Sequence, residues 1–357
     1  MWKSEIIKDN TKLKVIAEMT ERYYGPENDI SNVNYLEHEY FKNPEGNVEM
    51  NIAWSEENNE VAGQYAAIPM RVKVGDRERK ALMSVNTLTD DKYRGQGIFK
   101  ILATEVYDRA EKEGFELVYG MPNQNSYPGF LKYIGFSDLG AVPLYLRPLV
   151  PSNMVKHYLK NRVLEVLAHP FNPLFKIVDK KLDIETVTFT DNAEKYADVF
   201  WESIKDKYPV MISRNYEYIK YRFIDISRRD YTGFYAIADG KPVAYAIGRV
   251  MEVAGISCAM IADFLFLEGY EKEAITVLKR LMIQLKEEGA DMAGCMVTPA
   301  SSEAKILKKA GFFKCPKFME PQPFRFIYRQ LSKEDESLKL AGDLKNWFFT
   351  MGDYDVV

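Results

Sequence analysis

The sequence predicts an α/β fold built as two consecutive modules, and three observations support this prediction. A strand, a glycine-rich turn and a helix follow one another directly over residues 80–114. A hairpin, a strand, a helix, a second strand and a closing helix return in the same order over residues 235–312. The chain has 357 residues, of which 46% are hydrophobic and 13% aromatic, and this is enough for two packed cores.

The glycine-rich turn over residues 93–100 is the most informative stretch. Residues 80–89 before it have the apolar and β-branched content of a buried strand. After it, apolar residues recur at helical spacing until Gly114 ends the helix: Ile98, Ile101, Leu102, Val106 and Ala110. Gly95 and Gly97 allow positive φ angles, so consecutive N–H groups can point at one phosphate beside a helix N-terminus. The turn is therefore predicted to bind a phosphate-bearing ligand.

The pattern of this turn resembles one superfamily. Arg94 and Gly97 fit Arg/Gln-x-x-Gly-x-Gly/Ala, with Phe99 in place of the last small residue, whereas the two other common nucleotide-binding glycine motifs are absent. The turn is similar to that of the Gcn5-related N-acetyltransferase (GNAT) superfamily, whose loop amides hold the pyrophosphate of acetyl-coenzyme A. The resemblance implies that this cofactor contacts the turn and the strand end before it, at Thr87, Leu88, Thr89, Arg94, Gly95, Gln96, Gly97, Ile98 and Phe99.

The elements around the turn extend the resemblance. Paired strands over 61–74 precede it, and a strand over 115–120, an asparagine-containing turn and a helix that ends at Gly135-Phe136 follow it. The resemblance implies an α+β module, a mixed, mostly antiparallel twisted sheet flanked by helices, over residues 1–150. It also places the turn residues Asn123, Asn125 and Ser126 on the far side of the acetyl-coenzyme A.

The chain departs from the superfamily pattern at the acid and the base. Leu131 stands where many members have a tyrosine that protonates the leaving thiolate, and Met83 and Val85 stand where others have a general base. Five residues are candidates for catalytic roles instead: Tyr127, Tyr133, Asn86, Asp355 and the carboxylate of Val357. Each also has a structural interpretation, because tyrosines pack in cores, buried asparagines make hydrogen bonds, and a terminal segment can dock as a strand.

The second half reads as a degenerate copy of the first, over residues 185–331. Its strand and helix meet at residues 268–273, Glu-Gly-Tyr-Glu-Lys-Glu, where acidic side chains disfavour a pyrophosphate. A connecting helical segment over 151–184 precedes it, and an aromatic C-terminal segment over 332–357 is expected to dock back on the fold. This organisation resembles the tandem-domain acyltransferases of the superfamily.

Composition excludes several classes of function. The formal net charge is −4 without a dense basic cluster, so nucleic acid is not an expected partner. No apolar run reaches the roughly 18 residues of a membrane span, and no leader is recognisable. The three widely spaced cysteines predict reduced thiols in a cytoplasmic protein, and no histidine has metal-ligand spacing, so no metal is expected.

The predicted function is transfer of an acetyl group from acetyl-coenzyme A to a primary amine of a small molecule. The acceptor classes left open are amino sugars, aminoglycosides, amino acids and polyamines. One alternative is a coenzyme A-binding sensor or scaffold without turnover, which the missing acid and base favour. The other is an aminoacyl transferase of the FemABX-like, peptidoglycan-branching type, which the intact glycine turn disfavours.

Overall fold

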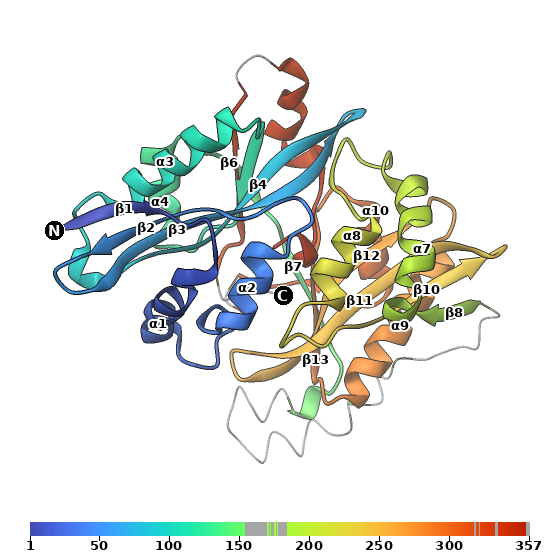
Figure 1. The fold of residues 1–357 in the computed structure, drawn as a ribbon. Helices are drawn as coiled ribbons and strands as arrows, with labels where there is room; N and C mark the ends of the chain where they lie inside the picture. Colours follow the sequence, from blue (N-terminus) through green and yellow to red (C-terminus); the bar gives the residue numbers. More distant parts are fainter. Residues whose placement is uncertain are drawn as a thin grey trace.

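The computed structural model describes residues 1–153, 170, 172, 175, 177, 184–317, 319–320, 322–332 and 335–354. Most of the connecting helical segment expected over 151–184 lies outside these residues. The described chain forms two sheets with helices packed on them (Figure 1). The predicted α/β fold of two modules, each with a mixed, mostly antiparallel sheet, is confirmed.

The first sheet has the order β1-β2-β3-β4-β5-β15-β6. Only β4 and β5 run parallel along this path, and all other neighbours are antiparallel. The strands are β1 (Trp2–Ile6), β2 (Glu49–Ser55), β3 (Glu60–Val74), β4 (Arg77–Thr89), β5 (Leu117–Gly120), β15 (Arg325–Gln330) and β6 (Ser137–Ala141).

The second sheet has the order β14-β7-β13-β12-β11-β10-β8, and again one pair, β12 and β13, is parallel. Its strands are β14 (Phe313–Lys314), β7 (Leu144–Pro148), β13 (Met292–Met296), β12 (Ile256–Phe266), β11 (Lys241–Val253), β10 (Thr232–Ala238) and β8 (Glu185–Thr188). Read from its opposite end, this order repeats that of the first sheet. The repeated order of elements in the second half of the sequence thus corresponds to a repeated sheet.

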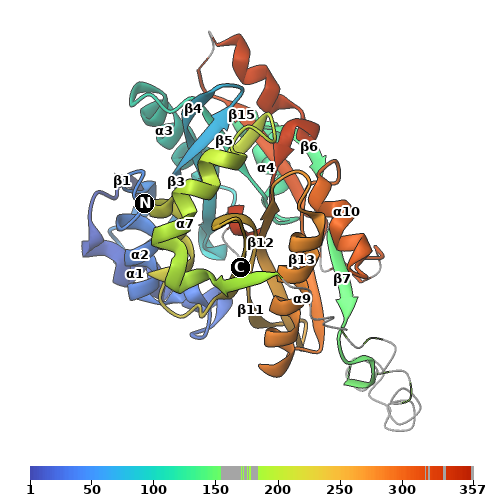
Figure 2. The same cartoon turned by 90° about the vertical axis from the view of Figure 1, so that its right-hand side faces the viewer.

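The two modules exchange one strand each. β7 comes from the first 150 residues but pairs with β13 and β14 of the second sheet. β15 comes from the second half but lies between β5 and β6 of the first sheet. Figure 2 shows β7 among the orange elements of the second module. The modules therefore complete each other, and the boundaries expected near 150 and 331 are crossed by backbone hydrogen bonds.

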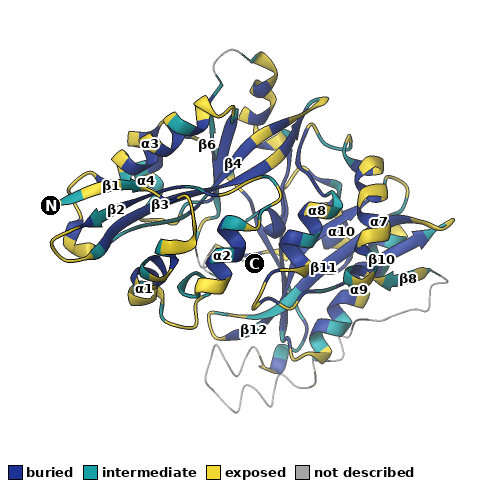
Figure 3. Ribbon diagram, viewed as in Figure 1, coloured by how far each residue is buried: buried dark blue, intermediate teal, exposed yellow. Residues whose placement is uncertain are grey.

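Helices cover the sheets where their apolar stripes face a strand. On the first sheet, α3 (Ile98–Lys112) packs one face through Ile98, Leu102, Val106 and Ala110, as its spacing predicts. The opposite face belongs to a core that α1 (Leu13–Tyr24) and α2 (Val33–Phe41) share with the second module. Figure 3 shows the sheets buried and the outer helix faces exposed.

The second module has four further helices, of which α7 (Phe189–Ile204) and α9 (Glu271–Glu287) pack against β10 and β11. The two shorter ones are α8 (Tyr216–Ile219) and α10 (Ser302–Lys309). Within the described ranges, no helix combines the length and the apolar character that crossing a bilayer requires.

The C-terminal segment docks on the fold. Trp347, Phe348 and Phe349 are buried, and β16 (Trp347–Phe348) pairs with β9 (Val210–Ile212), which itself extends β3. A buried ion network anchors the end of the segment. Its centre, Arg214, contacts Asp353 at 2.6 Å and Asp263 at 3.3 Å.

Candidate active site

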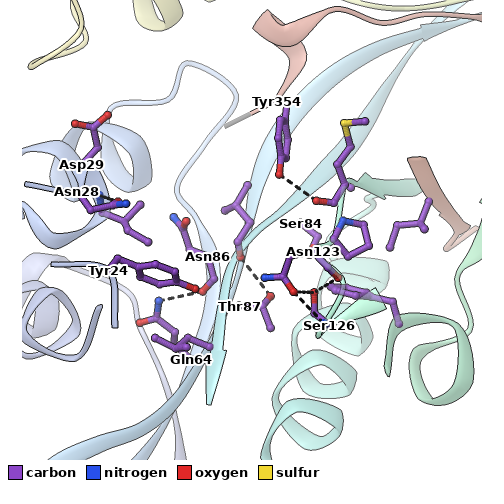
Figure 4. Close-up of a pocket in the computed structure, with 18 of the residues that line it drawn as sticks. Tyr24, Asn28, Asp29, Gln64, Ser84, Asn86, Thr87, Asn123, Ser126 and Tyr354 are labelled. Atoms are coloured by element: carbon purple, nitrogen blue, oxygen red, sulfur yellow. Dashed lines mark hydrogen bonds between the residues drawn. The ribbon is translucent and has the colours of Figure 1, made fainter. Parts of the chain in front are cut away.

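The main cavity lies where β4 and β5 diverge. Their last parallel pair is Ser84 with Gly120, after which β4 continues to Thr89 while the chain leaves β5 through Met121. A cavity of about 540 Å³ opens at this point, lined by residues of both strands, of the region around α1 and of the second module. Figure 4 labels Ser84, Asn86, Thr87, Asn123 and Ser126 among the residues that line it.

A β-bulge at Asn86 produces the divergence. Asn86 and Thr87 together oppose Tyr65 of β3, and Asn86 has a φ of 47°, a left-handed conformation that asparagine tolerates better than most residues. Its side-chain amide donates to Glu39 Oε2 at 2.7 Å and to the Tyr40 hydroxyl at 2.9 Å. Asn86 therefore anchors the bulge to α2, and its carbonyl accepts a hydrogen bond from Gln64 at 2.9 Å.

The glycine turn presents open backbone amides. Gly95 and Gly97 have φ angles of 80° and 76°, and a Cβ at Gly95 would meet nothing within 4 Å. Gly97 is the N-cap of α3 and makes no side-chain cap, so the first amides of the helix are left for another acceptor. Residues 94–97 are exposed. The turn thus fits a diphosphate group, as its sequence predicts.

Most side chains of the turn contact other residues of the chain. Arg94 pairs with Asp91 at 2.6 Å, and Gln96 Oε1 accepts a hydrogen bond from Trp2 at 3.0 Å. Ile98 is buried under the turn next to Gly63, where an added Cβ would lie 2.6 Å from the Ile98 side chain. Residues 95–98 would therefore bind a ligand through their backbone N–H groups.

Phe99 replaces the small residue of the superfamily pattern without blocking the turn. Its ring packs edge-on against Phe130 at 5.1 Å and Tyr65 at 5.8 Å. The same ring lies 3.0 Å from where a Cβ on Gly129 would be, so Gly129 makes room for it. Phe99 thus packs between α3 and the helical turn α4 (Tyr127–Gly129), which leads into the π-helix η4 (Phe130–Ile134).

The far wall is formed by the turn after β5. Asn123 and Ser126 line the cavity, whereas Asn125 does not. The Asn123 Oδ1 atom accepts the backbone N–H groups of Asn125 at 2.9 Å and Ser126 at 3.0 Å. Asn123 therefore fixes the shape of this wall, and Thr87 and Leu88 face it from β4.

The two tyrosines predicted as acids lie outside the cavity lining. The Tyr127 hydroxyl donates to Asp138 on β6 at 2.6 Å, and Tyr133 is 52% exposed. Tyr127 is the first residue of α4, and Tyr133 lies in the π-helix η4. Neither hydroxyl is placed to protonate a group in the cavity. Asp355 and Val357, the other two candidates at the C-terminus, lie outside the described residues.

Tyr354 is the functional candidate that sequence reasoning missed. It lines the cavity, and its hydroxyl donates to the carbonyl of Met121 at 3.1 Å, across 233 residues of sequence (Figure 4). Its carbonyl is held by the buried guanidinium of Arg222. The only sequence signal was the aromatic density of residues 347–354, which predicts docking but not the place where the segment docks.

The cavity also has a charged wall. Arg229, Arg249 and Glu252 line it from the second module, and Asp29 lines it from the loop between α1 and α2. Asp29 binds Arg229 at 2.8 Å. The acceptor side of the cavity is therefore polar and is built by both modules.

The front module matches a known family. Residues 11–138 match the acetyltransferase (GNAT) domain. This range contains the bulge in β4, the glycine turn and the turn after β5. Comparison with curated proteins finds no match.

Solved structures share the fold over nearly the whole chain. A conserved protein of Enterococcus faecalis V583, described as a probable N-acyltransferase, gives a TM-score of 0.64 at 12% identity over 93% of this chain and 73% of its own. A GCN5-related N-acetyltransferase from Anabaena variabilis gives 0.61 at 12% identity, with the same coverage of 93% and 73%. The Saccharomyces cerevisiae N-myristoyltransferase with bound myristoyl-CoA gives 0.63 at 11% identity, over 92% of this chain and 82% of its own.

The family match and the geometry of the site agree. The match covers the elements that diverge around the cavity and the turn whose amides are open. At 11–12% identity the solved structures establish the fold alone. Residues 11–138 thus match the acetyltransferase (GNAT) domain, and the chain as a whole shares the fold of these solved structures.

Proposed function

We propose that this chain is an N-acetyltransferase that moves the acetyl group of acetyl-coenzyme A to a primary amine of a small molecule. The observation that carries the proposal is the cavity at the divergence of β4 and β5, which residues of both modules line. A thioester that follows the strands and an amine that enters between the modules would meet in this space.

The residues around the cavity can supply what acyl transfer requires. The backbone amides of residues 95–99 would hold the diphosphate, and those of residues 87–89, beyond the bulge, would donate to the oxyanion. When the amine attacks the carbonyl carbon and the C–S bond breaks, the leaving thiolate needs a proton. We assign this role to the Tyr354 hydroxyl, which lines the cavity and donates to the Met121 carbonyl at 3.1 Å.

The amine must reach the carbonyl without its extra proton. Glu252 is exposed and lines the cavity, and its negative charge attracts a cationic amine. The ammonium proton would leave to water, because Asp29 already binds Arg228 and Arg229. Catalysis would then depend on positioning and on the oxyanion donors more than on a dedicated base.

The two alternative functions make different predictions. A coenzyme A sensor needs the amide turn but no acid, and Tyr354 in the cavity disfavours it. A FemABX-like aminoacyl transferase uses charged transfer RNA, and the open amide turn together with the formal charge of −4 disfavours it.

Thiol release separates these functions. The chain is mixed with acetyl-coenzyme A and a panel of primary amines, and free thiol is measured against time, while the melting temperature is measured with and without coenzyme A. Amine-dependent release with a thermal shift is the expected result. A thermal shift without release from any amine would favour the sensor, and the absence of both would remove coenzyme A from the proposal.

A further inference from the structure

Arg249 is a cation that the protein itself leaves uncompensated in the cavity. It lies on β11, is half-buried and lines the cavity from the second module. Within the described part of the chain, its Nε atom is buried without a hydrogen-bond partner, and no carboxylate pairs with its guanidinium. Its guanidinium carbon lies 5.9 Å from the centroid of the Tyr231 ring. A partly buried charge without a counter-ion is costly, so a site of this kind favours an anion.

The neighbouring charges do not neutralise Arg249. Asp29 is shared by two other guanidiniums, with Nε–Oδ distances of 3.3 Å for Arg228 and 2.8 Å for Arg229. One carboxylate thus serves two cations. Burial lowers the pKa of the Arg249 guanidinium and the charge of Arg229 lowers it further, whereas Tyr231 and Asp29 raise it only in part. Glu252 lines the same cavity three positions along β11, but it is exposed, and it forms no ion pair with Arg249 among the described residues.

The position of Arg249 separates it from the cofactor side. The diphosphate is expected on the turn at the start of α3, in the front module, whereas β11 belongs to the second sheet. An anion at Arg249 would therefore belong to the acceptor. Because a guanidinium can donate two parallel hydrogen bonds, it matches a carboxylate or a phosphate group.

We propose that Arg249 binds an anionic group of the acceptor, so that the acceptor is a primary amine that also carries a carboxylate or a phosphate. This inference rests on the proposed function, since it assigns the acceptor half of the same cavity. It narrows the open acceptor classes to amino acids and phosphorylated amino sugars, and it disfavours polyamines and aminoglycosides. The exposed carboxylate of Glu252 would face the amine of the same molecule.

Matched pairs of amines test the proposal. Each pair holds the amine constant and removes the anion: an amino acid with its carboxamide, and glucosamine 6-phosphate with glucosamine. Binding to the chain in the presence of coenzyme A is measured by calorimetry, and thiol release from acetyl-coenzyme A is measured in parallel. We expect the anionic member of at least one pair to bind about 10- to 100-fold more tightly, as one charged hydrogen-bonded contact predicts. The pair that shows this preference identifies carboxylate or phosphate as the source.

Two variants assign the preference to Arg249. In Arg249→Gln, the anionic member should lose the whole advantage while its neutral partner binds as before and the dissociation constant of coenzyme A stays unchanged. The matched control is Arg280→Gln on α9, an exposed arginine of the same module that does not line the cavity. It should keep the preference.

Three results would overturn the inference. They are equal binding within every pair, a preference that Arg249→Gln retains, and a loss of coenzyme A affinity in Arg249→Gln. Because binding is measured separately from thiol release, an anion preference without turnover would refute acetyl transfer while keeping the anion site.

Discussion

A single charge placed at Gly97 tests whether the turn before α3 holds the diphosphate. Gly97 has a φ of 76°, so any larger residue adds backbone strain, but its Cβ would meet only the Ile101 side chain at 3.9 Å. We therefore compare Gly97→Glu with Gly97→Gln. The two side chains are nearly the same size and carry the same backbone strain, and they differ only in charge.

The expected magnitude follows from Coulomb's law. At about 5 Å, two unit charges repel by about 1 kcal/mol in water and by about 3 kcal/mol at the effective dielectric constant of about 20 typical of a protein surface. Because the turn is exposed, the result should fall between these limits. The dissociation constant of coenzyme A is then about 5- to 150-fold higher for Gly97→Glu than for Gly97→Gln.

Calorimetry with coenzyme A measures this difference directly. The ratio should shrink when the salt concentration rises from about 0.1 M to about 1 M, because the screening length falls from about 10 Å to about 3 Å. Equal dissociation constants for the two variants at low salt, with both proteins folded by circular dichroism, would refute a diphosphate on this turn.

Three further predictions concern the C-terminal segment. Tyr354→Phe should lower kcat about 100-fold with little change in the KM for acetyl-coenzyme A, since a general acid acts on the chemical step; unchanged kcat would exclude this role. Arg214→Met should lower the free energy of unfolding, measured by urea denaturation, by about 3–5 kcal/mol, because Asp263 and Asp353 stay buried without their counter-ion. The surface variant Arg280→Met should leave the free energy of unfolding unchanged. Burial raises the pKa of Asp353 to about 6, so the folded chain keeps a proton that the unfolded chain releases between pH 4 and 6. Stability should therefore fall as pH rises through this window, and Asp353→Asn should flatten that slope; an identical pH profile in the variant would contradict this.

Local patterns gave the elements of the front module because their signals lie close together in the sequence. The apolar spacing of Ile98, Leu102 and Val106 predicted the helix that became α3, and Gly95 and Gly97 predicted the positive φ angles of the turn. The repeated order of elements in the second half could be predicted for the same reason. The structure agrees with it, since β12 and β13 run parallel as β4 and β5 do.

Local patterns did not reveal which distant segments meet. The exchange of β7 and β15 depends on pairings between strands that are far apart in sequence. The residues of neither strand indicate which other strand it will pair with. The same limit applies to Tyr127, whose hydroxyl donates to Asp138 on β6, eleven residues further along the chain. The Tyr354 hydroxyl lies at the cavity because two arginines fix the segment that carries it. Arg214 binds the Asp353 carboxylate, and Arg222 donates to the Tyr354 carbonyl.

By itself, therefore, the sequence determined the fold class, the amide turn and the resemblance of the front module to the GNAT domain, because each of these depends on residues a few positions apart. The tertiary structure decided which side chains share the cavity. Tyr354 and Arg249 reach it from the second half of the chain, Tyr354 through its hydrogen bond to the Met121 carbonyl and Arg249 from β11. Those contacts are set by how whole sheets pack, and packing between sheets leaves no periodic trace in the sequence.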